Sequence, residues 1–349
     1  LIEITNVGHG WIEGGPLFGT HTEVYLAGLW AAALDAASYI TENLNLTDLS
    51  ISFQKDATKV KEIIDKEFWN KEGQYFYNGK FIDGTYMHEK TVLSGVPIYF
   101  DAVTDAVKAF KTAASFSSNS YSTDWGVRIL PDSSKNYNPN SYHSGMVWPL
   151  FTGWASLAEY KTGNYVSGFS HVMNNLLMYH HWNKGSVEET LHGEIFKPAG
   201  VSSQQSWSET MVLQPITEGM LGIFPDALSN RIALNPHFPW HWKYVKVDNI
   251  IFGNHKIEFE RFRANIYIKN IDPWIEFSWI NKKISVDGCL FKVIKKIPRC
   301  SATNLIPGSE ISNINLPSKL RESYGCCDMG VYLIPLSDGE IKVGDILKL

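Results

Sequence analysis

The glutamates of this chain that are best suited to catalysis lie in two segments far apart in the sequence. Glu188, Glu189 and Glu194 belong to GSVEETLHGE, residues 185–194, and Glu13 belongs to GHGWIEGGPLFG near the start. Cleavage of a glycosidic bond needs two carboxyl groups. One protonates the leaving oxygen, and the other, ionised, activates water or attacks carbon. The two segments suit this chemistry, although three glutamates in ten residues also fit an exposed, solvated loop.

The neighbours of each glutamate favour different roles. Trp11 stands close to Glu13, and an apolar wall raises the pKa of a carboxyl group, as a general acid requires. Glu189 lies among Gln, Ser and His residues, which suits a general base. Adjacent residues of an extended loop face opposite sides, so we expect Glu189 in the pocket and Glu188 turned outward. Only a closed tertiary fold could bring Glu13 and Glu189 together.

A further acidic candidate is Asp124, in YSTDWGVR. It could also cap backbone N–H groups or pair with Arg128. Other chemistries have weaker signals, since the sequence contains no GxSxG elbow, phosphate-binding loop or HExxH motif. His180 and His181 are adjacent, and adjacent histidines on a helix face different directions. We therefore predict no metal and no cofactor.

Composition narrows the class of partner. The net charge of −5 gives no electrostatic reason to expect nucleic acid or an anionic membrane surface. Aromatic residues make up 13% of the chain. Aromatic faces with polar neighbours suit the apolar faces and hydroxyl edges of sugars, but a large core also holds many aromatics. The four cysteines form no metal-binding spacing, and a disulfide between Cys289 and Cys300 is one option beside free thiols.

The elements that must position these residues are helical at first. A chain of 349 residues is long enough for two domains. Residues 71–83 resemble a small hairpin, and the polar loops 119–145 and 183–204 are long enough to be functional. Apolar spacing predicts helices at 22–44, 52–70, 91–116, 146–162, 165–182 and 205–223.

The pattern changes after about residue 226. Short β-branched runs alternate with polar residues and are broken by Gly and Asn, which is typical of strands and turns. We predict a helical domain at 1–226 and an all-β domain, a sandwich without a strong helix, at 227–349.

Several segments, in order over residues 8–250, resemble bacterial proteins related to the amylo-α-1,6-glucosidase domain of glycogen-debranching enzymes. SYHSGMVWP resembles their Y-H-x-G-x-V-W-P segment, and SSQQSW their S-x-Q-x-W segment. VEETLHG is similar to (V/L)-P-E-x-x-x-G, with Glu189 on the general base and Glu188 in place of the usual proline. GWIEGG places Glu13 on the proposed acid. TEVYLAGLW places Glu23 on a glutamate that holds substrate or loop geometry.

The resemblance implies an (α/α)6 toroid and inverting hydrolysis of α-glucosides. A complete toroid has twelve helices and the pattern gives about six. The chain therefore looks like the C-terminal half of such an enzyme, with first helices or an oligomer partner missing. The expected partner is an α-linked oligosaccharide or polysaccharide, with no nucleic acid and no membrane. Two alternatives are an inactive carbohydrate-binding or structural protein, and a toroid glycosidase for another sugar such as rhamnose.

The hypothesis assigns further residues to the sugar. Tyr142, His143 and Gln205 would bind hydroxyl groups, and tryptophans would wall the subsite, although each also fits a place in the core. With Glu13 and Glu189 as catalytic residues, the predicted substrate-binding set is Trp11, Glu23, Asp124, Trp125, Tyr142, His143, Trp148, Gln205 and Trp207.

Overall fold

The chain divides into two compact units in a computed structural model, and each is described by itself. Unit 1 comprises residues 1–223 and 236–238, and unit 2 comprises residues 224–235 and 239–349. The structure describes the whole chain except residues 7–8, 183, 229–230, 240–241, 243–244, 246, 248–249, 253–254, 258–265, 267, 269–270, 273, 306–310, 313 and 343.

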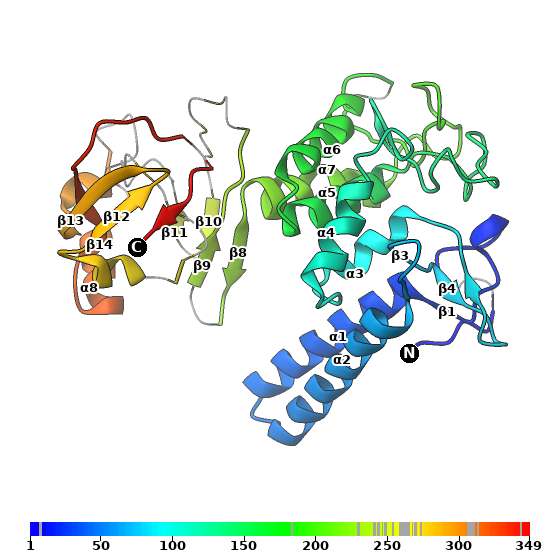
Figure 1. Cartoon of the computed structure of the whole chain (residues 1–349), viewed down its shortest axis with the longest axis horizontal. Coiled ribbons are helices and arrows are strands. Elements are labelled where there is room, and N and C mark those ends of the chain that lie inside the picture. The colour runs from blue at the N-terminus through cyan, green and yellow to red at the C-terminus, as the bar shows by residue number, and fades with distance from the viewer. Residues whose placement is uncertain are drawn as a thin grey trace. The chain divides into compact units, whose positions relative to one another are not determined.

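Unit 1 begins with a long helical hairpin. Helices α1 (Val24–Asn43) and α2 (Thr47–Glu67) lie side by side and antiparallel (Figure 1). Gly28 of α1 permits a close helix crossing, because a Cβ atom there would lie 2.7 Å from Pro97 in α3. The α1 helix is long and apolar enough to span a membrane by length and composition. In the structure it packs against α2 and α3.

The single helix predicted for 91–116 is wrong. A 3₁₀ turn, Val92–Ser94, leads into the short α3 (Gly95–Tyr99), and α4 (Ala106–Ser115) follows after a break. Asp101 adopts a left-handed conformation with φ 55°. The side chain of Asp105 accepts hydrogen bonds from the backbone N–H groups of residues 107 and 108, so it caps a new helix start.

Helix α5 (Pro149–Lys161) is the central helix of unit 1. Every residue from Pro149 to Tyr160 is buried, and α3, α4, α6 and α7 contact it (Figure 1). The helices α6 (Tyr165–Met178) and α7 (Ser206–Gln214) follow, and a π-helix, Pro215–Met220, continues α7. These helices confirm the helices predicted at 146–162, 165–182 and 205–223.

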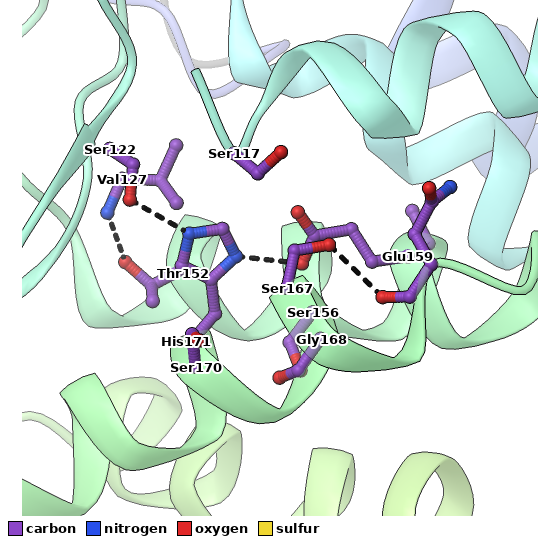
Figure 2. Close-up of polar contacts among 12 residues, drawn as sticks. Ser117, Ser122, Val127, Thr152, Ser156, Glu159, Ser167, Gly168, Ser170 and His171 are labelled. Atoms are coloured by element: carbon purple, nitrogen blue, oxygen red, sulfur yellow. Dashed lines mark hydrogen bonds and ion pairs between the residues drawn. The ribbon is translucent and has the colours of Figure 1, made fainter. Parts of the chain in front are cut away.

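A buried series of hydrogen bonds lies between α5 and α6 (Figure 2). Glu159 of α5 accepts from His171 Nδ1 of α6 at 2.7 Å, and both side chains are fully buried. His171 Nε2 lies 3.2 Å from the Oγ atom of Ser122, which belongs to the loop between α4 and α5. These hydrogen bonds hold α5, α6 and the segment around Ser122 together.

Short strands connect the helices of unit 1. They form an antiparallel three-stranded sheet and two hairpins. The sheet contains β1 (Thr22–Glu23), β4 (Gly79–Lys80) and β5 (Tyr86–Met87); the hairpins pair β2 (Trp69–Asn70) with β3 (Tyr75–Phe76) and β6 (Ser122–Thr123) with β7 (Gly126–Val127).

Unit 2 is rich in strands. Its core lies around Trp279, Ile284 and Val293, on a four-stranded antiparallel sheet in the order β14-β13-β12-β15. The described strands are β8 (Ile223–Asp226), which starts at the unit boundary, β9 (Arg231–Leu234), β10 (Ile250–Phe252), β11 (His255–Ile257), β12 (Lys283–Val286), β13 (Cys289–Pro298), β14 (Asp328–Pro335) and β15 (Leu347–Lys348).

One expectation for unit 2 needs correction. The unit is not all-β, since α8 (Leu316–Tyr324) is a regular helix beside two 3₁₀ turns, Ile275–Trp279 and Ser301–Asn304. Asn315 caps its start and Gly325, with φ 71°, ends it. All four cysteines are free, so Cys289 and Cys300 form no disulfide in this structure. The described residues contain one four-stranded sheet, and a second sheet facing it, as in a sandwich, stays a prediction.

Candidate active site

The segment that carries Glu189 is extended and held on both sides. Leu191 and Val147, which precedes α5, exchange backbone hydrogen bonds of 2.8 and 2.9 Å. The N–H group of Glu189 donates to the carbonyl of Ser202 at 2.9 Å. Gly193 must be glycine, because a Cβ atom would lie 2.3 Å from the Gly145 carbonyl oxygen. The carboxylate is therefore presented by a fixed backbone.

Tyr142 is hydrogen-bonded to Glu189, one of the two predicted catalytic glutamates. Its hydroxyl donates to Glu189 Oε1 at 2.6 Å. Burial raises the pKa of the Tyr142 hydroxyl well above its usual range, and the carboxylates of Glu189 and Glu13 raise it further. Tyr142 is thus protonated at neutral pH and can donate. A Cβ atom on Gly15, two residues beyond Glu13, would lie 3.3 Å from the Cβ atom of His143, so the fold brings the Glu13 loop next to the Tyr142 segment.

Glu188 does not point outward as predicted. It is as buried as Glu189, each with 5% of its surface exposed. Burial also raises the pKa of Glu188. The alternation expected of an extended strand assumes one face in solvent, whereas residues 196–202 fold back over this segment through the hydrogen bonds of His192 and Thr190.

Glu13 is exposed, and its neighbour Trp11 is part of an aromatic cluster. The Trp11 ring lies 5.0 Å from Trp154 and 5.7 Å from Trp207, measured between ring centroids. Trp207, at the start of α7, keeps 39% of its surface exposed. Trp11 and Trp207 therefore form an aromatic surface next to Glu13.

Glu23 is buried at the start of α1 and has an unusual environment. Its Oε1 accepts from the Thr20 hydroxyl at 2.8 Å, and within the described residues its buried Oε2 has no hydrogen-bond partner. Burial raises its pKa to about 7, against the smaller opposing effect of the nearby Thr20 and Tyr25 hydroxyl groups. The Tyr25 hydroxyl in turn accepts from the backbone N–H group of Trp11, which links Glu23 to the Glu13 loop.

His143 and Trp148 lie behind Tyr142. The Trp148 ring is 4.3 Å from that of Tyr142 and its Nε1 donates to the Tyr142 carbonyl at 3.0 Å, but only 3% of Trp148 is exposed. Burial lowers the pKa of His143, while the carboxylate of Glu13 acts in the opposite direction. Trp148 thus supports Tyr142 from the core and offers no open face.

The loop residues Asp124 and Trp125 are placed differently from one another. Asp124 is exposed. Trp125 is half-buried, and its Nε1 donates to the carbonyl of His192 at 3.0 Å, three residues beyond Glu189. Gln205 caps α7 through its own Oε1 and donates its N–H to the Val187 carbonyl.

Arg128 is a residue whose importance the sequence reasoning missed. Its Nε donates to the Gly193 carbonyl at 2.9 Å, and its Nη1 donates to the carbonyls of Asn119 and Ser120. Its carboxylate neighbour is Asp132, at 3.9 Å, where pairing with Asp124 was an alternative. The signal was present, because an arginine among Val127, Ile129 and Leu130 is expected to be buried and to need several acceptors.

Comparisons with known proteins bear on the family and the fold of this chain. Residues 242–348 match the MOSC domain family, and a search of curated proteins finds no match. A solved structure titled sialidase is similar over 68% of this chain with 15% identity and a TM-score of 0.58, which shows a shared fold. The chain spans 23% of the length of that sialidase.

A second solved structure has a lower score. The GH63 mannosylglycerate hydrolase from Thermus thermophilus, in complex with glucose, aligns with 56% of this chain and 47% of its own at 11% identity and a TM-score of 0.44. Residues 20–208 match the family described as mannosylglycerate hydrolase MGH1-like glycoside hydrolase domain. That match covers more than half of the chain and includes Glu189 and Glu23. The predicted relation to glycoside hydrolases is thereby confirmed, and the chain belongs to the MGH1-like glycoside hydrolase family.

Proposed function

We propose that the helical unit is the catalytic domain of an inverting glycoside hydrolase that cleaves an α-linked glucoside or a related α-linked sugar. Glu189 would be the general base that activates water, and Glu13 the general acid that protonates the leaving oxygen. The observation that carries this proposal is that the Tyr142 hydroxyl donates to Glu189 while the Glu13 loop packs against the neighbouring His143, where a Cβ atom on Gly15 would lie 3.3 Å from the His143 Cβ.

Other residues have supporting roles in this proposal. Trp11 and Trp207 would contact the apolar face of a pyranose, because Trp207 is exposed at this cluster. His143, neutral at pH 7 through burial, would bind a sugar hydroxyl. Asp124, Trp125 and Gln205 belong to loops next to the Glu189 segment. Inversion requires room for a water molecule, so we expect carboxyl groups about 6.5–9.5 Å apart in a sugar complex.

The proposal extends to the domain arrangement. Residues 1–226 would be part of an (α/α)6 toroid, and residues 227–349 a separate β domain with a sandwich core. The name of the matched family makes mannosylglycerate a substrate to test beside α-glucosides and α-rhamnosides. The alternative is a carbohydrate-binding protein without catalysis, and the absence of hydrolysis by the full chain would support it.

The test is hydrolysis of this panel by the full chain, with NMR of the first product. An inverting enzyme releases the β-anomer from an α-linked substrate. Glu189→Gln and Glu13→Gln should each lower kcat/KM by roughly 10²–10⁴-fold. Glu194→Gln is the matched control, since Glu194 is exposed on the same loop. Release of the α-anomer would overturn inversion, and full activity of Glu189→Gln would overturn the assigned base.

A further inference from the structure

Unit 1 has a surface depression away from the residues proposed for catalysis. It lies at the C-terminal end of α2, beside β2, β3 and β5; it is open to solvent and has a volume of about 820 Å³. Small-molecule sites occupy roughly 300–1,000 Å³, so the size is suitable for a ligand. None of the residues predicted for the Glu13–Glu189 site lines this depression.

Aromatic side chains dominate one side of the depression. The rings of Tyr77 and Tyr86 stack with centroids 4.4 Å apart and an interplanar angle of 21°. Tyr75 and His88 meet Tyr77 edge-on, at 5.8 and 5.0 Å. The hydroxyl of Tyr75 donates to the carbonyl of His88 at 3.0 Å, which joins β3 to the end of β5. These contacts fix the rings before any ligand binds, so little rotamer entropy is lost on binding.

The charges of the lining cancel. Lys66 and Lys71 stand against Glu67 and Glu72. Glu67 is already paired with Lys80 at 3.0 Å, and Lys66 with Glu62 at 3.0 Å. A balanced lining has no net attraction for a phosphate, a carboxylate or a cation. It does offer hydrogen-bond donors and acceptors around aromatic rings.

We propose that this depression, formed by Tyr75, Tyr77, Tyr86 and His88 beside Asn70, is a second carbohydrate-binding site that takes a neutral oligosaccharide. The Tyr86 ring is stacked on Tyr77 and has Lys80 Nζ 5.2 Å from its centroid, so the C–H face of a pyranose would pack against the edges of the tyrosine rings. Hydroxyl groups would bond to the amide of Asn70 and to the charged side chains at the edge. The choice of a sugar as ligand rests on the proposed function, but the site itself has no part in the chemical step.

Affinity electrophoresis of the full chain in native gels tests this, with soluble glycogen and yeast α-mannan as probes. We expect at least one polysaccharide to retard the wild-type chain. Tyr86→Ala should weaken the retardation about tenfold, as loss of an aromatic contact would. Tyr86→Phe should retain it, because the ring is kept. Tyr39→Ala, at an exposed tyrosine of α1, is the matched control.

The results separate this proposal from the catalytic one. If Glu189→Gln abolishes hydrolysis while Tyr86→Ala binds both probes like the wild type, only the second site is wrong. If the wild type hydrolyses nothing but shows Tyr86-dependent retardation, only the catalytic function is wrong. No retardation of the wild type by either polysaccharide would overturn the second site. Hydrolysis of a small aryl glycoside should be unchanged in Tyr86→Ala, since no subsite next to Glu189 is altered.

Discussion

Tyr142 is the side chain on which the proposed active site depends most directly. Its hydroxyl gives Glu189 a hydrogen bond of 2.6 Å. A hydrogen bond to a charged group contributes about 1.5–3 kcal/mol, so Tyr142→Phe should lower kcat/KM by roughly 10- to 100-fold. Steady-state kinetics on the best substrate of the panel measures this.

A matched control exists for this change. The hydroxyl of Tyr160 is also buried, and it has no hydrogen-bond partner within the described residues. Tyr160→Phe should therefore leave the kinetics unchanged. Equal rates for Tyr142→Phe and the wild type would show that Glu189 does not need this donor.

The raised pKa of Glu23 predicts that the stability of the fold depends on pH. Its pKa is about 7 in the folded chain and 4.5 ordinarily, because burial penalises the charged form. The folded state thus holds the proton more tightly than the unfolded state. The resulting stabilisation is complete below pH 4.5 and is lost as pH rises to about 7, a change of about 3 kcal/mol.

Glu23→Gln should remove this pH dependence. Its amide oxygen can still accept from Thr20, so the variant should unfold like the wild type near pH 4.5 and be more stable above pH 7. Urea titrations at pH 4.5, 6 and 8 measure the difference. Glu42→Gln, at an exposed glutamate of α1, controls for the Glu→Gln change itself. If the free energy of unfolding changed with pH in the same way for Glu23→Gln and the wild type, Glu23 would not be the cause of the pH dependence.

At the scale of elements, the Glu159–His171 pair links α5 to α6 (Figure 2). His171→Leu would leave the carboxyl group of Glu159 buried without its partner, and removing one member of a buried pair costs roughly 3–5 kcal/mol. We expect that loss in urea unfolding followed by the helical circular dichroism signal. The double variant Glu159→Leu/His171→Leu should lose less than His171→Leu alone. A double variant that loses the sum of both single changes would show that the two residues act independently.

The helices were predictable where apolar spacing is long and uninterrupted, as in α1 and α6. The break inside 91–116 was missed because apolar residues continue through it, while Asp105 already had the sequence context of a helix cap. The sequence analysis predicts no helix at α8 because segments with a strand pattern surround it. Asn315 and Gly325 are nevertheless the signals for its start and its end.

The candidate site was predictable in a different way. The shared order of segments with a known family points to Glu189 and Glu13, but no local pattern reveals that the Tyr142 hydroxyl bonds to Glu189. The burial of Glu188 depends on residues 196–202 folding back, which is a tertiary event. The Arg128 side chain likewise joins three segments through hydrogen bonds to backbone carbonyls. Every residue has a backbone carbonyl, so the sequence does not show which ones accept these bonds.

On the scale of the whole molecule, each unit has a core of its own. The described part of unit 2 packs around Trp279, Ile284 and Val293, and unit 1 packs around α5. The MGH1-like match lies in the first unit and the MOSC match in the second. Separate cores predict separate unfolding events.

Differential scanning calorimetry of the full chain should therefore show two transitions. His171→Leu should lower only the transition of unit 1. Trp279→Ala, at a side chain that is 2% exposed, should lower only that of unit 2. Losses of several kcal/mol correspond to shifts of roughly 10 °C in units of this size. Ser122→Ala, which removes a single hydrogen bond of about 1 kcal/mol, should shift only the first transition and by less. A single transition that moves with both His171→Leu and Trp279→Ala would show that the two cores unfold as one.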